Sequence, residues 1–224
     1  MEKKHKQLVI AIDGPAGSGK STVSKRLAKN LGLLYIDTGA MYRALTLKAM
    51  RGKLNLEDED LLADLARTTV IDLKEKDGSG QEVFLDGENV AEFIRTPELT
   101  NNVKYIARVP GVRAEMVKLQ RSIGERHGAV LEGRDIGTVV FPDADYKFYL
   151  EADVEERARR RYKELIGKDK GLTLEDIRKD VLIRDESDMK RRVGALKKAP
   201  GSIIIDTTNM SIDKVVEKLL SCIK

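Results

Sequence analysis

Five short, mostly apolar runs recur along the chain, at residues 8–12, 33–36, 129–131, 147–150 and 202–205. Segments with apolar residues at helical spacing lie between them. Runs of this length are typical of strands that are buried on both faces, and the intervening helices then cover those faces. The pattern predicts an α/β fold with a five-stranded parallel sheet and helices on both faces.

The pattern changes between residues 68 and 95. Short apolar groups at 70–73 and 83–85 are separated by polar, glycine-containing turns, as in an antiparallel meander. A sheet of this size is too small to fold alone. We therefore interpret 68–95 as a small antiparallel β insertion carried by a single domain that spans residues 1–224.

Two helical segments follow the fourth apolar run. Asp153-x-x-Glu156 and Thr173-x-x-Asp176 each resemble a capping box. In a capping box, the side chain of the first residue accepts a hydrogen bond from the backbone N–H three residues later, and the side chain of that later residue accepts one from the N–H of the first. The polar stretch at 167–171 between the two segments is typical of a hinge. We expect a short helical lid near residues 158–175.

A glycine-rich loop directly follows the first apolar run. It reads Gly14-Pro15-Ala16-Gly17-Ser18-Gly19-Lys20-Ser21, and a helical pattern comes next. A strand, such a loop and a helix start, in that order, are the context in which G-x-x-x-x-G-K-[ST] binds phosphate. The alternative is a turn that binds nothing, but a chance match in a chain of this length occurs in roughly one case in a hundred.

The chemistry of this loop follows from its backbone. Glycines let successive N–H groups point inward, and the helix N-terminus adds a partial positive charge. Lys20 can then reach the β- and γ-phosphates of a nucleotide, and the hydroxyl of Ser21 can ligate Mg²⁺. The motif predicts the P-loop NTPase fold and a site for a nucleoside triphosphate with Mg²⁺.

Composition narrows the class of protein. Of the 224 residues, 41% are hydrophobic and 35% are charged, which is the balance of a globular chain. No apolar run approaches the roughly 20 residues of a membrane span, and the charged start lacks the apolar core of a signal peptide. With Cys222 as the single cysteine and two histidines, we expect neither a disulfide framework nor a zinc site. These features predict a cytoplasmic protein with no membrane partner.

The net charge of +4 is compatible with nucleic acid and equally with a pocket for several phosphates. Aromatic residues make up only 4% of the chain and none is Trp, so the bases of a single strand would find few rings to stack on. We therefore expect no nucleic-acid partner.

Polar residues follow two further strands of the predicted sheet. Asp37-Thr38-Gly39 comes after the second apolar run, and Gly133-Arg134-Asp135 comes after the third. In an open α/β sheet, ligands bind beyond the carboxyl ends of the strands. Asp37 and Asp135 have an alternative interpretation as helix caps, but their joint position beside the phosphate loop favours one shared site.

Two groups of arginines occur later in the chain. Arg157, Arg160 and Arg161 fall on one side of a helix, and Arg184, Asp188 and Arg191 have the spacing of a shared helix face. A solvated helix with surface salt bridges is the ordinary explanation for both groups. The polar link between the two helices favours a second interpretation, in which a hairpin closes over a nucleotide and brings guanidinium groups onto its phosphates.

The motifs combine into a pattern that covers nearly the whole chain. Its segments are 14–22, 37–43, 94–96, 112–113, 133–144, the group Arg184-Asp185-x-x-Asp188-x-x-Arg191, and 206–208. The pattern resembles that of the bacterial cytidylate kinases, a family of P-loop nucleoside monophosphate kinases. Residues 133–144 carry the most specific part of the resemblance, and the insertion at 68–95 resembles the monophosphate-binding insertion of that family.

The resemblance implies three groups of functional residues. The ATP-binding group comprises Gly14, Pro15, Ala16, Gly17, Ser18, Gly19, Lys20, Ser21, Thr22, Arg157 and Arg160, with Ser21 also as the Mg²⁺ ligand. The acceptor-binding group comprises Thr38, Tyr42, Arg43, Arg113, Arg134, Asp135, Arg184, Asp188 and Arg191, of which Arg113 and Asp135 read the cytosine edge. The catalytic group comprises Lys20, Arg134, Arg160, Arg161 and Arg184.

The chain departs from the family pattern at three positions. Glu132 stands where aspartate is usual, Lys104 where a base-contacting serine is frequent, and Ala195 where proline is common. The change at Lys104 concerns base reading most directly.

The function that the resemblance implies is the Mg²⁺-dependent transfer of a phosphoryl group from ATP to CMP or dCMP, by a protein that acts as a monomer. Two alternatives remain at this point. One is another P-loop kinase of small molecules, acting on AMP, UMP or shikimate. The other is a P-loop regulator that binds nucleic acid.

Overall fold

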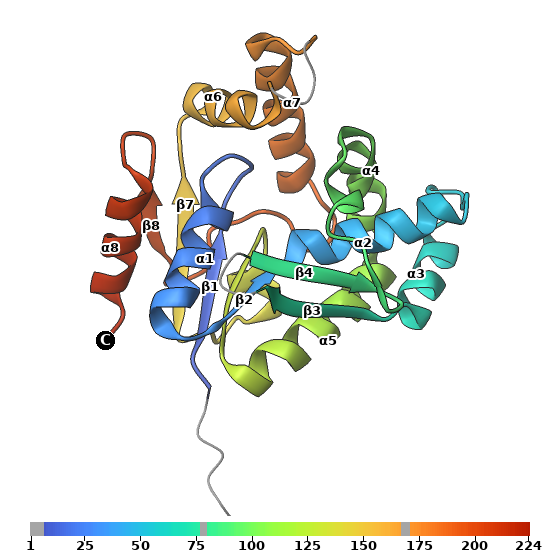
Figure 1. Ribbon diagram of the computed structural model, residues 1–224, viewed down its shortest axis with the longest axis horizontal. Helices are drawn as coiled ribbons and strands as arrows, with labels where there is room; N and C mark the ends of the chain where they lie inside the picture. Colours follow the sequence, from blue (N-terminus) through green and yellow to red (C-terminus); the bar gives the residue numbers. More distant parts are fainter. Residues whose placement is uncertain (1–6, 77–79, 167–170) are drawn as a thin grey trace, which may run out of the picture.

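The computed structural model describes residues 7–76, 80–166 and 171–224 (Figure 1). Within these residues the central sheet has five strands in the order β2-β6-β1-β7-β8, and every neighbouring pair is parallel. The strands are β1 (Val9–Asp13), β2 (Leu34–Asp37), β6 (Ala129–Gly133), β7 (Tyr146–Glu151) and β8 (Ile203–Asp206). The predicted five-stranded parallel sheet is confirmed, with each strand within two residues of its apolar run.

Helices cover both faces of this sheet. The helices are α1 (Lys20–Leu31), α2 (Thr38–Arg51), α3 (Glu59–Thr68), α4 (Pro97–Ala107), α5 (Pro110–His127), α6 (Val154–Leu165), α7 (Leu174–Met189) and α8 (Ile212–Cys222), with short turns η1 (Phe93–Arg95) and η2 (Ile136–Val140). On one face, Leu27 of α1 and Leu219 of α8 pack with Phe148. On the other, Met41 of α2 and Met116 of α5 belong to the larger core.

The first turns of two helices are fixed by their capping residues. Thr96 accepts a hydrogen bond from the backbone N–H of Leu99 and Pro97 occupies the first turn of α4, because proline there loses no intrahelical bond. Helix α3 begins at Glu59 with Asp58 as its cap, since the Asp58 carboxylate accepts from the N–H of Leu61.

The insertion forms a separate sheet of three antiparallel strands among the described residues, β3 (Ile71–Lys76), β4 (Gly80–Leu85) and β5 (Glu88–Asn89). The turn at 77–79 lies outside the described residues. Ile71, Val83 and Leu85 are buried in the main core, and β4 packs against α2 (Figure 1). The insertion therefore shares the core of the domain and does not have one of its own.

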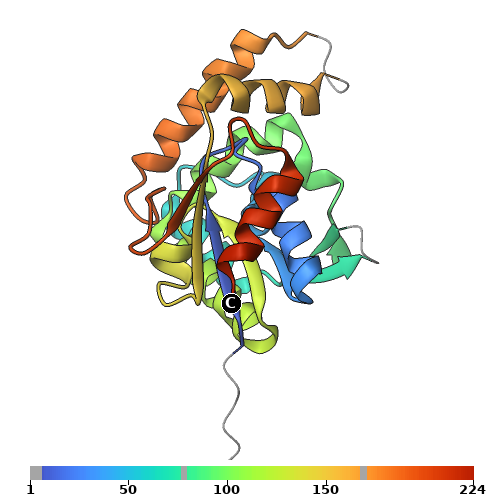
Figure 2. The same cartoon turned by 90° about the vertical axis from the view of Figure 1, so that its left-hand side faces the viewer.

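Helices α6 and α7 form a hairpin beyond the carboxyl ends of the strands (Figures 1 and 2). Ala158, Ile177 and Val181 pack between them as a small apolar cluster. The link at 167–170 lies outside the described residues. The capping box at Thr173 and Asp176 is confirmed.

The capping box expected at Asp153 and Glu156 is wrong, although Asp153 does cap the helix. Asp153 is the cap of α6, but its carboxylate accepts from the N–H of Glu155. The Glu156 carboxylate instead accepts from Nε of Arg160 at 3.0 Å, one turn further along the helix. A charged partner at i+4 competes with the weaker bond to the backbone of the cap.

Candidate active site

One cavity of about 520 Å³ lies where the carboxyl ends of the strands meet the helical hairpin. Eighteen of the twenty-one residues in the three implied functional groups line it: Ala16, Gly17, Ser18, Gly19, Lys20, Ser21, Thr22, Thr38, Tyr42, Arg43, Arg113, Arg134, Asp135, Arg160, Arg161, Arg184, Asp188 and Arg191. Gly14, Pro15 and Arg157 do not line it. Segments far apart in the sequence thus converge on a single site.

The glycine-rich loop connects β1 to α1 under tight steric limits. Gly14 has φ of +151°, and a Cβ there would lie 2.1 Å from the backbone oxygen of Leu150 on the neighbouring strand β7. Gly17 has φ of +77°, and a Cβ there would lie 2.9 Å from the backbone oxygen of Arg157 on α6. Both positions need glycine because strand and helix approach the loop closely.

Lys20 is the first residue of α1 and is 5% exposed. Its Nζ donates to the backbone oxygen of Pro15 at 2.6 Å, so the ammonium group lies inside the loop. Burial, together with the positive charges of Arg134 and Arg184, lowers the pKa of Lys20 to about 7. A buried cation with a lowered pKa is an unfavourable arrangement that an anion at the loop would relieve.

Glu132 lies at the end of β6 and is also buried. Tyr35 donates its Oη to Oε1 of Glu132 at 2.5 Å, and the Ser21 hydroxyl is close enough to lower the pKa of the carboxyl group. Burial and the nearby Asp37 raise the pKa of Glu132, against the attraction of Lys20. Two oxygen donors, the Ser21 hydroxyl and the Glu132 carboxylate, thus lie together at the mouth of the loop.

Asp37 and Thr38 begin α2 at one side of the cavity. The Asp37 carboxylate accepts from the N–H of Ala40 and pairs with Arg43, both at 2.9 Å. Burial alone would raise the pKa of Asp37, but Arg43 and the Ala40 N–H hold it below its ordinary value. Asp37 is therefore a helix cap and a residue of the cavity wall at once, so the two interpretations are compatible. Thr38 donates to the backbone oxygen of Glu132 at 2.7 Å.

Arg113 of α5 and Asp135, which follows β6, form a buried ion pair. The side chains are only 3% and 7% exposed. The Arg113 guanidinium lies 5.5 Å above the ring of Tyr42, whose pKa burial raises to about 12. Asp135 makes no side-chain cap for η2, so the helix-cap alternative is wrong for this residue.

Asp188 of α7 lies between two arginines. Nε of Arg134 donates to Oδ2 of Asp188 at 2.6 Å, and Arg191 donates to Oδ1. Burial would raise the pKa of Asp188, but Arg134 and Arg191 lower it. Because Asp188 is 5% exposed, the solvated-helix explanation is wrong for this group.

Arg184 and Arg191, the other two residues of this group, lie in different parts of the structure. Helix α7 ends at Met189, so Arg191 reaches Asp188 from beyond the helix and not along a shared face, as the spacing suggested. Burial and the charge of Arg134 lower the pKa of Arg184, in the helix, to about 10.

The arginines of α6 have separate roles. Arg157 is buried, pairs with Asp185 of α7 at 2.7 Å and donates to the backbone oxygen of Ala16 at 3.1 Å. It fastens both helices of the hairpin to the glycine-rich loop. Arg161 lines the cavity and pairs with the exposed Glu164.

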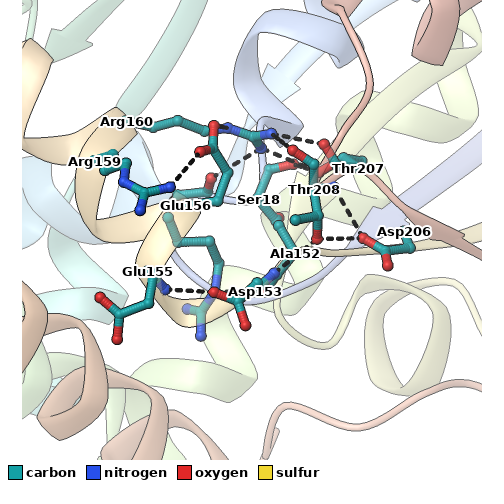
Figure 3. A network of polar contacts seen from close by, with 12 residues as sticks. Ser18, Ala152, Asp153, Glu155, Glu156, Arg159, Arg160, Asp206, Thr207 and Thr208 are labelled. Carbon is teal, nitrogen blue, oxygen red and sulfur yellow. Dashed lines mark hydrogen bonds and ion pairs between the residues drawn. The ribbon is translucent and has the colours of Figure 1, made fainter.

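Arg160 joins three segments (Figure 3). Its Nη2 donates to the backbone oxygen of Thr207 at 2.6 Å, and its Nε bonds Glu156. Thr207, in turn, donates its hydroxyl to the backbone oxygen of Ser18 at 3.1 Å. The loop after β8 is thereby tied to the glycine-rich loop and to α6.

Sequence reasoning assigned no role to several residues of the cavity wall. Thr207, Thr208, Met210, Ser211, Ile212 and Val215 line the cavity from β8 to α8. The signal for part of this group was the polar stretch 206–208 at the end of the fifth apolar run. Glu132 was noted only as a departure from a family pattern.

The similarity of the chain to known proteins agrees with this geometry. A family model described as cytidylate kinase matches residues 10–224. The chain belongs to the cytidylate kinase family. The cytidylate kinase of Anoxybacillus flavithermus is 50% identical over 224 residues, covering 100% of this chain and 98% of that protein. The cytidylate kinase of Caldanaerobacter subterraneus subsp. tengcongensis is 49% identical over 215 residues, covering 96% of this chain and 94% of that protein.

The chain also resembles a solved structure, and this likeness concerns only the fold. An uncharacterized protein from Eubacterium ventriosum superposes with a TM-score of 0.53 at 13% identity, covering 97% of this chain and 98% of that one. Among the described residues, every helix is too short or too polar to cross a membrane.

Of two residues that depart from the cytidylate kinase pattern, Glu132 lines the cavity and Lys104 does not. Lys104 of α4 is exposed, with Nζ 5.1 Å above the ring of Tyr105, and does not line the cavity. Helix α4 presents Val103 and Ala107 there instead. Glu132 lines the cavity and keeps a carboxylate beside Ser21. Lys104 therefore contributes nothing to the cavity wall.

Proposed function

We propose that the protein transfers the γ-phosphoryl group of ATP to CMP or dCMP in a direct in-line reaction that yields ADP and CDP or dCDP. The observation that carries this proposal is the convergence of the glycine-rich loop with two carboxylate–arginine pairs, Arg113–Asp135 and Arg134–Asp188, on one cavity. A phosphate-binding loop and a base-reading pair in one cavity suit two nucleotides.

The donor end is the glycine-rich loop with α6 and the loop after β8. Backbone N–H groups and Lys20 would hold the phosphates of ATP. The negative charge would offset the burial that lowers the pKa of Lys20, so the lysine would bind in its charged form. Arg160 and Arg161 line the cavity on this side and would meet the charge of the transferring group.

The acceptor end is built from α2, α5 and the segment after β6. The exocyclic amine of cytosine is a hydrogen-bond donor, which suits the Asp135 carboxylate, while Arg113 would donate to the acceptors of the same edge. Tyr42 packs beneath Arg113, and Thr38 and Arg43 line the wall beside it. Arg134, Arg184 and Arg191 would bind the monophosphate, and Asp188 would accept from the sugar hydroxyls.

The residues at the mouth of the loop fit Mg²⁺. Mg²⁺ prefers oxygen ligands and usually takes only one or two from the protein, with substrate phosphates and water completing the shell. The Ser21 hydroxyl would be a ligand, and the Glu132 carboxylate beside it would hold coordinated water. When bound, Mg²⁺ neutralises charge on the transferred group.

Catalysis needs no general base. The second pKa of a phosphate monoester is near 6, so the acceptor oxygen is already a competent nucleophile at neutral pH. The residues of the site would align the two phosphates and place positive charge around the transferring group. Enclosure by the α6–α7 hairpin would exclude water, which would otherwise accept the phosphoryl group.

We also propose that the protein acts as a monomer in the cytoplasm, without a nucleic-acid or membrane partner. Residues assigned to both nucleotides line the same cavity, so the proposed site needs no residue from a second copy. The single cysteine, Cys222, suits a reducing compartment.

Phosphorylation rates on a panel of acceptors test the proposal. With ATP and Mg²⁺, CMP and dCMP should be used far better than AMP, UMP or shikimate. Preference for one of the latter would favour another small-molecule kinase. Slow hydrolysis without any acceptor, together with nucleic-acid affinity that falls steeply with salt, would favour a P-loop regulator.

A further inference from the structure

The amide of Gln81 completes the free edge of the central sheet. Strand β2 lies at one end of the sheet and, among the residues that the structure describes, pairs only with β6. Nε2 of Gln81 donates to the backbone oxygen of Tyr35, and its Oε1 accepts from the backbone N–H of Asp37 at 3.1 Å. In a parallel ladder, one residue bonds the C=O of residue i and the N–H of residue i+2 on the neighbouring strand. The side-chain amide therefore takes the place of one residue of a further parallel strand.

Gln81 belongs to a different sheet from the strand that it binds. It lies in β4 of the insertion, paired with Glu75 of β3. The insertion is also held to the domain by apolar packing, because Val83 and Leu85 of the same strand are buried in the main core. The hydrogen bonds of Gln81 are thus an addition to this packing, directed at one short segment of β2.

That segment serves both ends of the proposed site. Asp37 caps α2 and pairs with Arg43 in the cavity wall. Tyr35 donates to Glu132, which lines the cavity together with Ser21 of the phosphate loop. Gln81 itself does not line the cavity.

We infer that Gln81 is a positioning residue for the acceptor nucleotide. Its amide fastens the insertion to the end of β2 and fixes the backbone of Asp37, and hence the Asp37–Arg43 pair, in the orientation that the acceptor site needs. The inference rests on the proposed function for its kinetic readout, since that function supplies the acceptor.

The test compares Gln81→Met with a matched control on the same strand. Met keeps the length of the side chain and removes both hydrogen bonds. The control is Glu82→Met, because the next residue of a strand points to the opposite face and Glu82 bonds only Asn89 within the insertion. Two lost hydrogen bonds of ordinary strength predict that KM for CMP rises about tenfold in Gln81→Met. KM for ATP should rise less than KM for CMP, and the melting temperature should fall by a few degrees because the two hydrogen bonds also stabilise the fold. Glu82→Met should change neither KM.

Amide hydrogen exchange gives a second readout that does not depend on substrate. Exchange at Tyr35–Asp37 should become faster in Gln81→Met and stay unchanged in Glu82→Met. An unchanged KM for CMP, or an equal rise in the KM for ATP, would overturn the positioning role. If Gln81→Met fails to fold, Gln81→Glu keeps the acceptor oxygen and removes the donor. Its second carboxylate oxygen then faces the backbone oxygen of Tyr35 and repels it, so KM for CMP should rise at least as much, and no rise would overturn the inference.

The two proposals fail in different ways. Wild-type protein that does not phosphorylate CMP would contradict the proposed function, and the exchange experiment would still decide whether Gln81 fixes the end of β2. Active wild-type protein with an unaffected Gln81→Met variant would contradict the positioning role alone.

Discussion

Arg134 donates from Nε to Oδ2 of Asp188 at 2.6 Å, although the two residues lie 54 positions apart in the chain. The contact joins the end of β6 to the last turn of α7, the second helix of the hairpin. With Asp188 almost fully buried, this is an internal ion pair between the sheet and the hairpin.

Replacing Asp188 tests its role toward the acceptor sugar. Asp188→Asn keeps the shape of the side chain and removes its charge, so a charge-assisted hydrogen bond to the sugar hydroxyls is lost. Such a bond is worth roughly 1.5–3 kcal/mol, and we expect kcat/KM for CMP to fall about 10- to 150-fold. The loss for dCMP should be smaller because dCMP lacks one hydroxyl, and KM for ATP should change little. Steady-state kinetics with equal, small effects on all three substrates would contradict this role.

The lowered pKa of Lys20 predicts that kcat/KM for ATP depends on pH. Its pKa in the free protein is lowered to about 7, so the side chain is increasingly neutral as pH rises above that value. Because the phosphates of ATP favour the charged form, kcat/KM for ATP should decline above pH 7, by at most about tenfold per pH unit. A pH profile between 6 and 9 measures this decline, and a flat profile would contradict it.

The variant Lys20→Met is the control for this profile. It should abolish the decline and lower kcat by several powers of ten, while CMP binding and the melting temperature stay close to wild type. Unfolding of the variant would show instead that Lys20 is needed for the structure.

Gly194 lies against Arg113, so a substitution at Gly194 tests the proposed base-reading pair of Arg113 and Asp135. It has φ of +66°, and a Cβ there would lie 2.1 Å from Nη2 of Arg113. Gly194→Ala must displace that guanidinium, and a misplacement of about 1 Å in a site can cost a hundredfold. We expect kcat/KM for CMP to fall between about tenfold and a hundredfold. Gly201→Ala is the matched control, since Gly201 has φ of +73° with nothing within 4 Å. Equal effects of the two changes would point to backbone strain alone.

Arg157 predicts a stability effect. Because its pair with Asp185 is buried, Arg157→Met leaves an uncompensated carboxylate inside the protein, and we expect a loss of about 3–5 kcal/mol in the free energy of unfolding. Arg159→Met, at an exposed position of the same helix, should cost no more than about 0.5 kcal/mol. Urea unfolding measures both. The double variant Arg157→Met, Asp185→Leu should recover part of the loss, because no buried charge remains.

The fold was predictable where local pattern decides it. Short apolar runs and the glycine-rich loop are read within a window of a few residues, and the parallel sheet then brings its carboxyl ends together. This is why Thr38, Arg134 and the glycine-rich loop were placed in one site from the sequence.

The remaining features depend on contacts between distant segments, which no local window contains. The spacing of Arg157 with Arg160 suggested a shared role, yet Asp185 on another helix holds Arg157 away from the cavity. The spacing of Arg184, Asp188 and Arg191 was compatible with a solvated helix face, and it gave no sign that Arg134 at the end of β6 pairs with Asp188. The amide of Gln81 has no sequence signal, because its partners belong to the edge of a different sheet.

Helix α7 is continuous from Leu174 to Met189, and this continuity makes the hairpin a lever. Its first half packs on α6, which carries Arg160 and Arg161, and its last turns carry Arg184 and Asp188. For the proposed function, a rotation that brings α6 onto the donor would therefore move the proposed acceptor contacts as well. We expect heterotropic cooperativity, which linkage requires to be reciprocal: the factor by which ATP changes the affinity for CMP equals the factor by which CMP changes the affinity for ATP.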